Sequence, residues 1–142
     1  MIDAAIVGLG RWGKTLVEAV QGKSDKIRFT RAVSRNPSQH REFLEKHHLL
    51  AGSSLAEALA DKSIKAVALA TPHTQHVDEV ITAAGAGKAV FCEKPLALTK
   101  EGTARAISDF ELLAADDPVA AWRGRMLDAF GGYARKSPAY GG

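Results

Sequence analysis

The stretch AIVGLGRWGKT near the N-terminus fits two phosphate-binding patterns at once. Gly8, Gly10 and Gly13 form GxGxxG, the dinucleotide fingerprint, in which backbone amides at a helix N-terminus hold a pyrophosphate. Gly8 and Gly13, followed by Lys14 and Thr15, form GxxxxGKT, the P-loop of nucleoside triphosphatases. The first pattern predicts redox chemistry with a dinucleotide, and the second predicts an enzyme that uses ATP or GTP.

Residues further along the chain favour the dinucleotide pattern. A P-loop enzyme also needs a strand that ends in an aspartate for magnesium, but the later apolar runs end in Ser34, Thr71 and Glu93. A dinucleotide fold instead places a ribose-reading residue about twenty positions past the glycines. Ser34 and Arg35 stand there in place of the usual acid. Because a hydroxyl beside a guanidinium suits a 2′-phosphate, the pair predicts NADP, with NAD as the alternative.

Alternating strand and helix patterns would position these residues. Helix-period segments separate the predicted strands, which are apolar runs at residues 4–7, 27–33, 64–70 and 88–92. The alternation predicts an α/β fold with a Rossmann-type, doubly wound, mostly parallel sheet in a single domain. The ligand crevice of such a sheet lies beyond the carboxyl ends of its strands, where Gly8, Ser34, Thr71 and Glu93 stand.

Composition and charge limit the class of protein. The chain has 142 residues, of which 46% are hydrophobic and 25% charged, and its single cysteine excludes an intrachain disulfide. The N-terminal apolar run is too short for a signal peptide or a membrane span, so a cytoplasmic protein without membrane attachment is expected. Residues 1–118 carry 15 basic and 15 acidic side chains, which places the net charge of +3 after them. No nucleic-acid-binding face is therefore predicted.

Three motifs, in this order and spacing, resemble a known family. They are GLGRWG at residues 8–13, ATPHTQH at 70–76 and FCEKPLALT at 91–99. The combination is similar to the cofactor domain of the glucose-fructose oxidoreductase and inositol dehydrogenase family, often written Gfo/Idh/MocA. The resemblance covers residues 1 to about 110. It implies a nicotinamide-dependent oxidoreductase that transfers hydride to or from a sugar, polyol, cyclitol or related carbonyl substrate.

The resemblance also implies roles for individual residues. Those under the cofactor pyrophosphate would be Gly8, Leu9, Gly10, Arg11, Trp12 and Gly13. Ser34 and Arg35 would face the adenosine ribose. Those along the nicotinamide half would be Thr71, Pro72, His73, His76, Glu93, Lys94 and Pro95. Lys94 would be the catalytic group, donating to a substrate oxygen that gains negative charge, and a cis bond to Pro95 would fix its direction. His73 stands where the family usually has asparagine.

Several side chains also have plainer interpretations. Those with metal-ligating atoms near the strand ends are His73, His76, Cys92 and Glu93. They lack CxxC or HExxH spacing, so no metal site is predicted. Cys92 is expected to be a structural cysteine rather than a nucleophile, and Trp12 is expected to pack as a lid on the glycine loop. The histidines expected to be solvated on a helix are His40, His47 and His48.

Two classes of function remain open at this point. The chain is either the cofactor domain of an oxidoreductase, weakly active alone, or a non-catalytic dinucleotide-binding module that docks a partner. The family's substrate domain has no counterpart among the 142 residues, and no histidine follows Pro95. We expect a dinucleotide-binding domain at 1–118 and a weakly structured tail at 119–142. A truncated frame or a natural short form would then need a separate substrate domain or self-association to complete the site.

Overall fold

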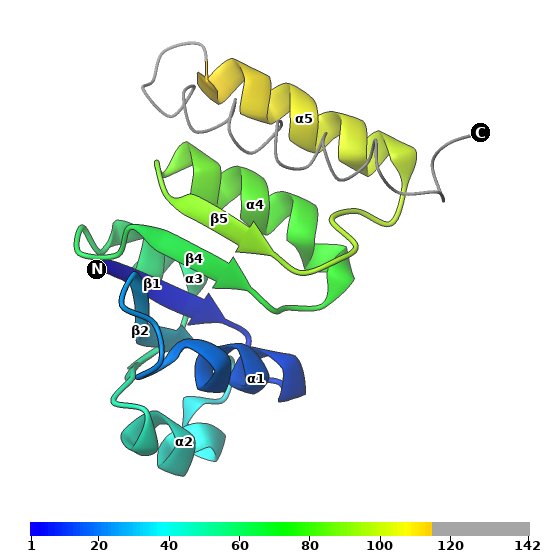
Figure 1. The fold of residues 1–142 in the computed structure, drawn as a ribbon. Helices are drawn as coiled ribbons and strands as arrows, with labels where there is room; N and C mark the ends of the chain where they lie inside the picture. Colours follow the sequence, from blue (N-terminus) through cyan, green and yellow to red (C-terminus); the bar gives the residue numbers. More distant parts are fainter. Residues whose placement is uncertain (115–142) are drawn as a thin grey trace, which may run out of the picture.

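The computed structural model describes residues 1–114, in which strands and helices alternate as predicted (Figure 1). The strands are β1 (Ile2–Val7), β2 (Ile27–Val33), β3 (Leu50–Gly52), β4 (Ala66–Leu69) and β5 (Ala89–Cys92). The helices are α1 (Arg11–Val20), α2 (Arg41–Lys46), α3 (Leu55–Ala60), α4 (His76–Gly85) and α5 (Lys100–Ala114), with 3₁₀ turns η1 (Pro37–His40) and η2 (His73–Gln75). The predicted boundary at 118 and the predicted tail at 119–142 lie outside the described residues.

All five described strands form one parallel sheet in the order β3-β2-β1-β4-β5. The chain builds outward from β1 through β2 and β3, and then returns to the other side of β1 to add β4 and β5. This reversal confirms the predicted Rossmann-type α/β fold. The register aligns the carboxyl ends of the central strands, because Val7 pairs with both Val33 and Leu69. The loops that follow β1, β2 and β4 therefore meet at one edge.

Helices cover both faces of the sheet. Side chains of β1 alternate between the faces, as successive residues of a strand do. Ala5 and Val7 pack in a cluster with α3 and α4, whereas Ala4 and Ile6 pack in a cluster with α1 and α2. Burial on both faces explains why β1 reads as a continuous apolar run. Helix α5 packs on α4 beyond β5 (Figure 1).

The short edge strand β3 is the one strand of the described sheet that the sequence pattern did not predict. It has three residues, and it pairs with β2 through Arg31 opposite Leu50 and Val33 opposite Gly52. Leu50 and Ala51 are both exposed, so the segment shows neither alternation nor a long apolar run. β3 matters for the site because it places the loop after Gly52 at the carboxyl edge of the sheet.

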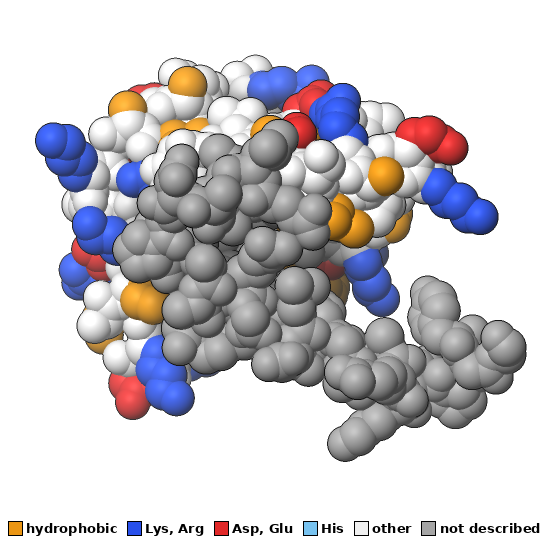
Figure 2. Space-filling view, turned by 90° about the horizontal axis from the view of Figure 1, so that it is seen from above, with side chains coloured by type: hydrophobic (Ala, Val, Ile, Leu, Met, Phe, Trp, Pro, Cys, Tyr) orange, Lys and Arg blue, Asp and Glu red, His pale blue; other side chains and the backbone are white. Residues whose placement is uncertain are grey.

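On the face of the described residues that Figure 2 shows, charged side chains of both signs are present. Two of the described ion pairs tie the sheet to its surroundings: Arg28 bonds Asp3 on the neighbouring strand, and Arg31 bonds Glu57 of α3. Both ion pairs join neighbouring elements of the fold. The predicted lack of nucleic-acid binding stays a prediction.

Candidate functional site

A cleft of about 330 Å³ lies over the carboxyl ends of β1, β2 and β4. Its walls are the loops that follow these strands together with the loop after β3. The predicted site residues that line it are Gly8, Leu9, Ser34, Arg35, Thr71 and Pro72. A larger, open hollow of about 700 Å³ lies beside α2 and β3, lined by Leu44, Leu49 and Leu50 among others. It contains none of the predicted site residues, so we assign the site to the smaller cleft.

The three glycines of the loop after β1 have different physical reasons to be glycine. Gly8 has φ +95°, and a Cβ there would lie 2.6 Å from the Ala70 carbonyl oxygen. A Cβ on Gly13 would lie 1.9 Å from the Gly8 carbonyl oxygen, so only glycine lets α1 approach the loop this closely. Apart from its neighbours in the chain, no described residue has an atom within 4 Å of the Gly10 Cβ position. The fold therefore requires Gly8 and Gly13, while the open side of Gly10 leaves room for close approach of a ligand to backbone.

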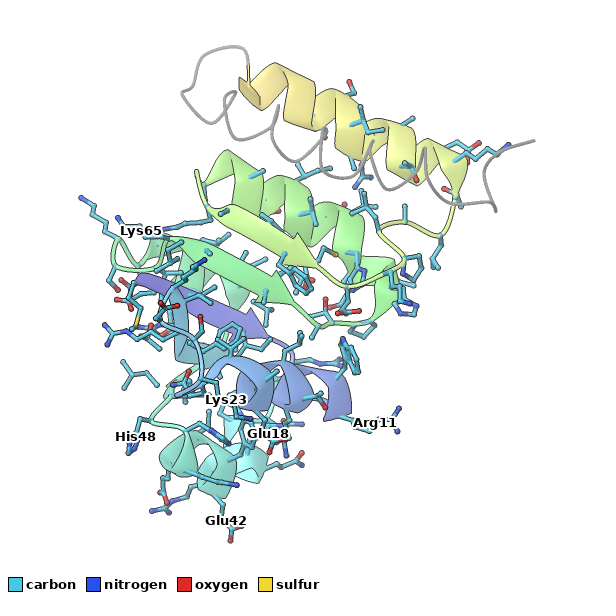
Figure 3. All side chains as sticks on the ribbon, viewed as in Figure 1. Arg11, Glu18, Lys23, Glu42, His48 and Lys65 are labelled. Atoms are coloured by element: carbon cyan, nitrogen blue, oxygen red, sulfur yellow. The ribbon has the colours of Figure 1, made fainter. Side chains whose placement is uncertain are left out.

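The other predicted loop residues divide between core and surface. Leu9 is 3% exposed and packs in the cluster with α1 and α2, so the loop can offer a ligand only its backbone at this position. Arg11 is exposed and extends away from α1 (Figure 3). Trp12 is 50% exposed, and the expectation that it packs as a lid on the loop stays a prediction.

The two residues that distinguish a P-loop are engaged elsewhere in the protein. The Lys14 Nζ lies 5.3 Å from the centroid of the Phe43 ring, which directs the ammonium toward α2. The Thr15 hydroxyl donates to the Arg11 carbonyl oxygen of its own helix at 3.0 Å. A P-loop would use this lysine on phosphates and this hydroxyl on magnesium. The geometry favours the dinucleotide pattern.

The turn after β2 presents a hydroxyl and a guanidinium to the cleft. The Ser34 backbone amide donates to the Gly52 carbonyl oxygen at 3.2 Å, which anchors the turn to β3. The Ser34 hydroxyl accepts from the Asn36 amide at 3.3 Å, a local turn that serine favours. Arg35 is exposed and makes no ion pair with any residue from 1 to 114. Backbone contacts thus hold Ser34 and Arg35 in the lining of the cleft.

His76 joins the two motifs that were predicted to line the nicotinamide half. Its ring is fully buried, with Nδ1 2.8 Å from the Pro95 carbonyl oxygen and Nε2 3.0 Å from the Thr71 carbonyl oxygen. A buried imidazole between two carbonyls fixes the loop after β4 relative to the loop after β5. In this conformation the ring reaches the site through those loops, and its predicted direct contact with a cofactor stays a prediction.

The remaining predicted residues lie outside the lining of the cleft, three of them on the segment after β5 and His73 in η2 after β4. The Glu93 amide donates to the Leu69 carbonyl oxygen at 3.1 Å, which extends the pairing of β4 with β5 by one residue. Lys94 is exposed, and the Lys94–Pro95 peptide bond is cis, as expected. His73 is also exposed, with its ring centroid 5.4 Å from that of His76. The carboxyl edge of the sheet therefore carries two groups of predicted residues, linked by His76.

Glu79 lines the cleft, although the sequence pattern did not predict it as a site residue. It lies one turn beyond His76 on α4 and accepts a hydrogen bond from the Thr71 hydroxyl. Burial raises the pKa of the Glu79 carboxyl, and the Thr71 hydroxyl opposes this change. The signal was present in the spacing, because residues i and i+3 share one face of a helix.

Cys92 is predicted to react slowly with thiol reagents. Burial, followed by the charges of Glu79 and Glu93, raises the pKa of the thiol to about 11. At pH 8 about one thiol in a thousand is then ionised, and the thiolate is the reactive species. Modification by a disulfide reagent should be at least tenfold slower in the folded chain than in urea. Equal rates would show that Cys92 is an accessible, reactive thiol.

Comparison with known proteins agrees with this geometry. A family model described as "Oxidoreductase family, NAD-binding Rossmann fold" (GFO_IDH_MocA) matches residues 2–114. Inositol 2-dehydrogenase of Rhizobium meliloti is 36% identical over 97 residues, which are 68% of this chain and 28% of that protein. The scyllo-inositol 2-dehydrogenase (NADP(+)) IolU of Bacillus subtilis is 32% identical over 109 residues, 76% of this chain and 33% of that protein.

Solved structures show the same likeness. Apo scyllo-inositol dehydrogenase from Lactobacillus casei superposes with a TM-score of 0.74 at 26% identity, covering 80% of this chain and 34% of that one. The WlbA dehydrogenase from Bordetella pertussis, in complex with NADH and UDP-GlcNAcA, gives 0.72 at 28% identity, covering 79% and 34%. The chain spans about a quarter to a third of the length of the curated relatives it matches. The match over residues 2–114 places the chain in the Gfo/Idh/MocA family of oxidoreductases, as its NAD-binding Rossmann domain.

Proposed function

We propose that the cleft binds a nicotinamide dinucleotide and that the chain supplies the cofactor half of a hydride-transferring oxidoreductase. The observation that carries the proposal is the glycine loop: two of its glycines are demanded by packing, and Gly10 alone opens to space at the N-terminus of α1. Backbone amides and the helix dipole favour a pyrophosphate there. The substrate class is a sugar, polyol, cyclitol or related carbonyl compound, which the inositol dehydrogenases among its relatives support.

We further propose that NADP is preferred to NAD. Ser34 and Arg35 line the end of the cleft where the adenosine ribose of a dinucleotide lies in this fold, and no acid stands there to repel a 2′-phosphate. The relatives do not decide between the two cofactors, since one is named for NADP(+) and another is complexed with NADH. The turn after β2 in this chain is therefore the stronger argument.

Replacement of Arg35 by alanine is predicted to remove most of that preference. A charge-assisted hydrogen bond to phosphate contributes about 1.5–3 kcal/mol, which corresponds to a ten- to a hundredfold preference for NADPH. Calorimetric affinities for NADPH and NADH should differ by this factor in the parent and converge in Arg35→Ala. Arg41→Ala is the matched control, because Arg41 is an exposed arginine that pairs with Glu45 instead. Equal affinities in the parent would show that Arg35 does not contact the cofactor.

The wall that holds the substrate would come from polypeptide beyond the described residues. Three exposed apolar side chains border the Lys94 segment: Phe91 at 54%, Leu96 at 37% and Leu98 at 61%. They are suited to be covered by a substrate domain, provided by a longer chain, a separate domain or self-association. We therefore propose weak turnover for the 142-residue chain by itself. Positioning of the substrate carbon near the nicotinamide contributes about 7–11 kcal/mol to such reactions, and an open site lacks it.

The cellular setting is a separate question. Among residues 1–114, no helix combines the length and apolarity needed to cross a bilayer. We propose a cytoplasmic location for the reaction, in keeping with the lone cysteine and the nicotinamide chemistry.

A further inference from the structure

His40 lies at the same end of the cleft as Ser34 and Arg35. It is the last residue of η1 and lines the cleft, whereas the sequence pattern predicted a solvated histidine at this position. Its Nδ1 is buried and has no hydrogen-bond partner among the described residues. A buried imidazole nitrogen without a partner is costly. A histidine of this kind in the lining of a ligand cleft is a candidate to interact with the bound ligand.

The surroundings of His40 disfavour its charged form while the cleft holds no anion. Burial is the larger cause and the Lys14 ammonium is the second, and both lower the pKa of the ring. Lys14 reaches this position from α1, where its Nζ lies over the Phe43 ring. The other charged groups around the cleft are Arg35 on the preceding turn and Glu79 on the far wall. Arg41, next in the chain, is engaged with Glu45.

We propose that His40 forms a proton-linked phosphate site with Ser34 and Arg35, in which His40 takes up a proton when a dinucleotide carrying a 2′-phosphate binds. The inference rests on the proposed function and deepens it, since it concerns how the same cleft tells NADPH from NADH. Ser34 and Arg35 supply donors that are always present, whereas His40 supplies a charge that forms on binding. The Lys14 ammonium lies over the Phe43 ring outside the cleft lining and acts on the His40 ring through its charge.

Electrostatics gives the direction of the coupling. A bound phosphate dianion favours the imidazolium, so the pKa of His40 is higher in the NADPH complex than in the free chain. By linkage, NADPH binding then strengthens as pH falls through the window between the two values, and the gain is lost above the higher one. Within that window the ratio of NADPH to NADH affinity changes by up to about tenfold per pH unit. The phosphate itself titrates near pH 6, so comparison of variants must isolate the ring.

The test is calorimetric titration of the 142-residue chain with NADPH and with NADH, at pH 7, in buffers of different ionisation enthalpy. The dependence of heat on buffer gives the number of protons taken up. We expect net uptake with NADPH that is absent with NADH and lost in His40→Asn. His48→Asn is the matched control: His48 is exposed with φ +54°, a conformation that asparagine tolerates. In Lys14→Met, the NMR-detected titration of the His40 ring should move to higher pH.

The results of this titration distinguish the proposed dinucleotide binding from the proposed proton uptake by His40. Equal proton uptake with both dinucleotides, or uptake that persists in His40→Asn, overturns the His40 site while leaving NAD(P) binding intact. If the parent chain binds neither dinucleotide, the proposed function fails together with the inference. If His40→Asn keeps the pH dependence of the NADPH-to-NADH ratio, the titrating group is the phosphate and not the ring. A loss of that dependence in His40→Asn, with His48→Asn unchanged, supports the site.

Discussion

Gly13→Ala is expected to destabilise the fold strongly. The added Cβ would lie 1.9 Å from the Gly8 carbonyl oxygen, which is backbone and cannot rotate aside. Relief would require α1 to move off the end of β1, where Val17 is fully buried against the sheet. Changes of this kind reach about 4 kcal/mol or more, a large share of the roughly 5–15 kcal/mol that stabilises a domain. The melting temperature should fall by about 15 °C or more.

Gly10→Ala is the matched control for this prediction. It lies three residues away, and among residues 1–114, its own chain neighbours aside, no atom stands within 4 Å of its Cβ position. Its melting temperature should stay within about 2 °C of the parent, as surface changes that touch nothing do. If Gly13→Ala were as stable as Gly10→Ala, the close contact between the glycine loop and α1 described above would not exist in solution.

Lys94→Ala is expected to abolish hydride transfer without abolishing cofactor binding. Lys94 is exposed on the segment that His76 ties to the loop after β4. A preorganised ammonium beside the substrate oxygen stabilises charge that develops in the transition state, and loss of such a donor costs about a hundred- to a thousandfold in turnover. The assay follows NADPH absorbance with sugars, polyols and cyclitols, for the chain combined with the substrate domain of an inositol dehydrogenase relative.

The control for this assay is Lys100→Ala, which removes an exposed lysine at the start of α5. It should leave turnover unchanged, and both variants should bind NADPH within about threefold of the parent. Turnover that appears with the added domain and survives Lys94→Ala would assign the chemistry to another group. If the parent binds NADPH but never turns over in any combination, the chain is a non-catalytic dinucleotide-binding module.

The parts of the fold that depend on local sequence patterns could be predicted from the sequence. The apolar runs predicted β1, β2, β4 and β5 because buried parallel strands are continuous and apolar. The GxGxxG spacing predicted the glycine loop between β1 and α1, and the structure shows that Gly8 and Gly13 are required by packing while Gly10 is open. The choice against a P-loop also stands, since Lys14 points toward Phe43 rather than into the loop.

The parts that the sequence could not supply depend on long-range contacts. β3 forms because β2 offers it an edge, and its own three residues carry no strand pattern. His76 matched a motif, but its position between the Thr71 and Pro95 carbonyls follows from how two loops meet. Glu79 and His40 reach the cleft from α4 and η1, and their altered pKa values arise from burial that only the packed structure defines.

The central claim is that a nicotinamide dinucleotide lies in the cleft with its pyrophosphate against the open side of Gly10. Calorimetric titration of NADPH into the parent chain and into folded Gly10→Ala tests it most directly, because the added methyl group fills space that only a ligand would use. We expect one site per chain in the parent and an affinity at least about tenfold weaker in Gly10→Ala, a loss of about 1.4 kcal/mol. Equal affinity in the two proteins, or ATP binding that is tighter than NADPH binding and depends on Lys14, would contradict it.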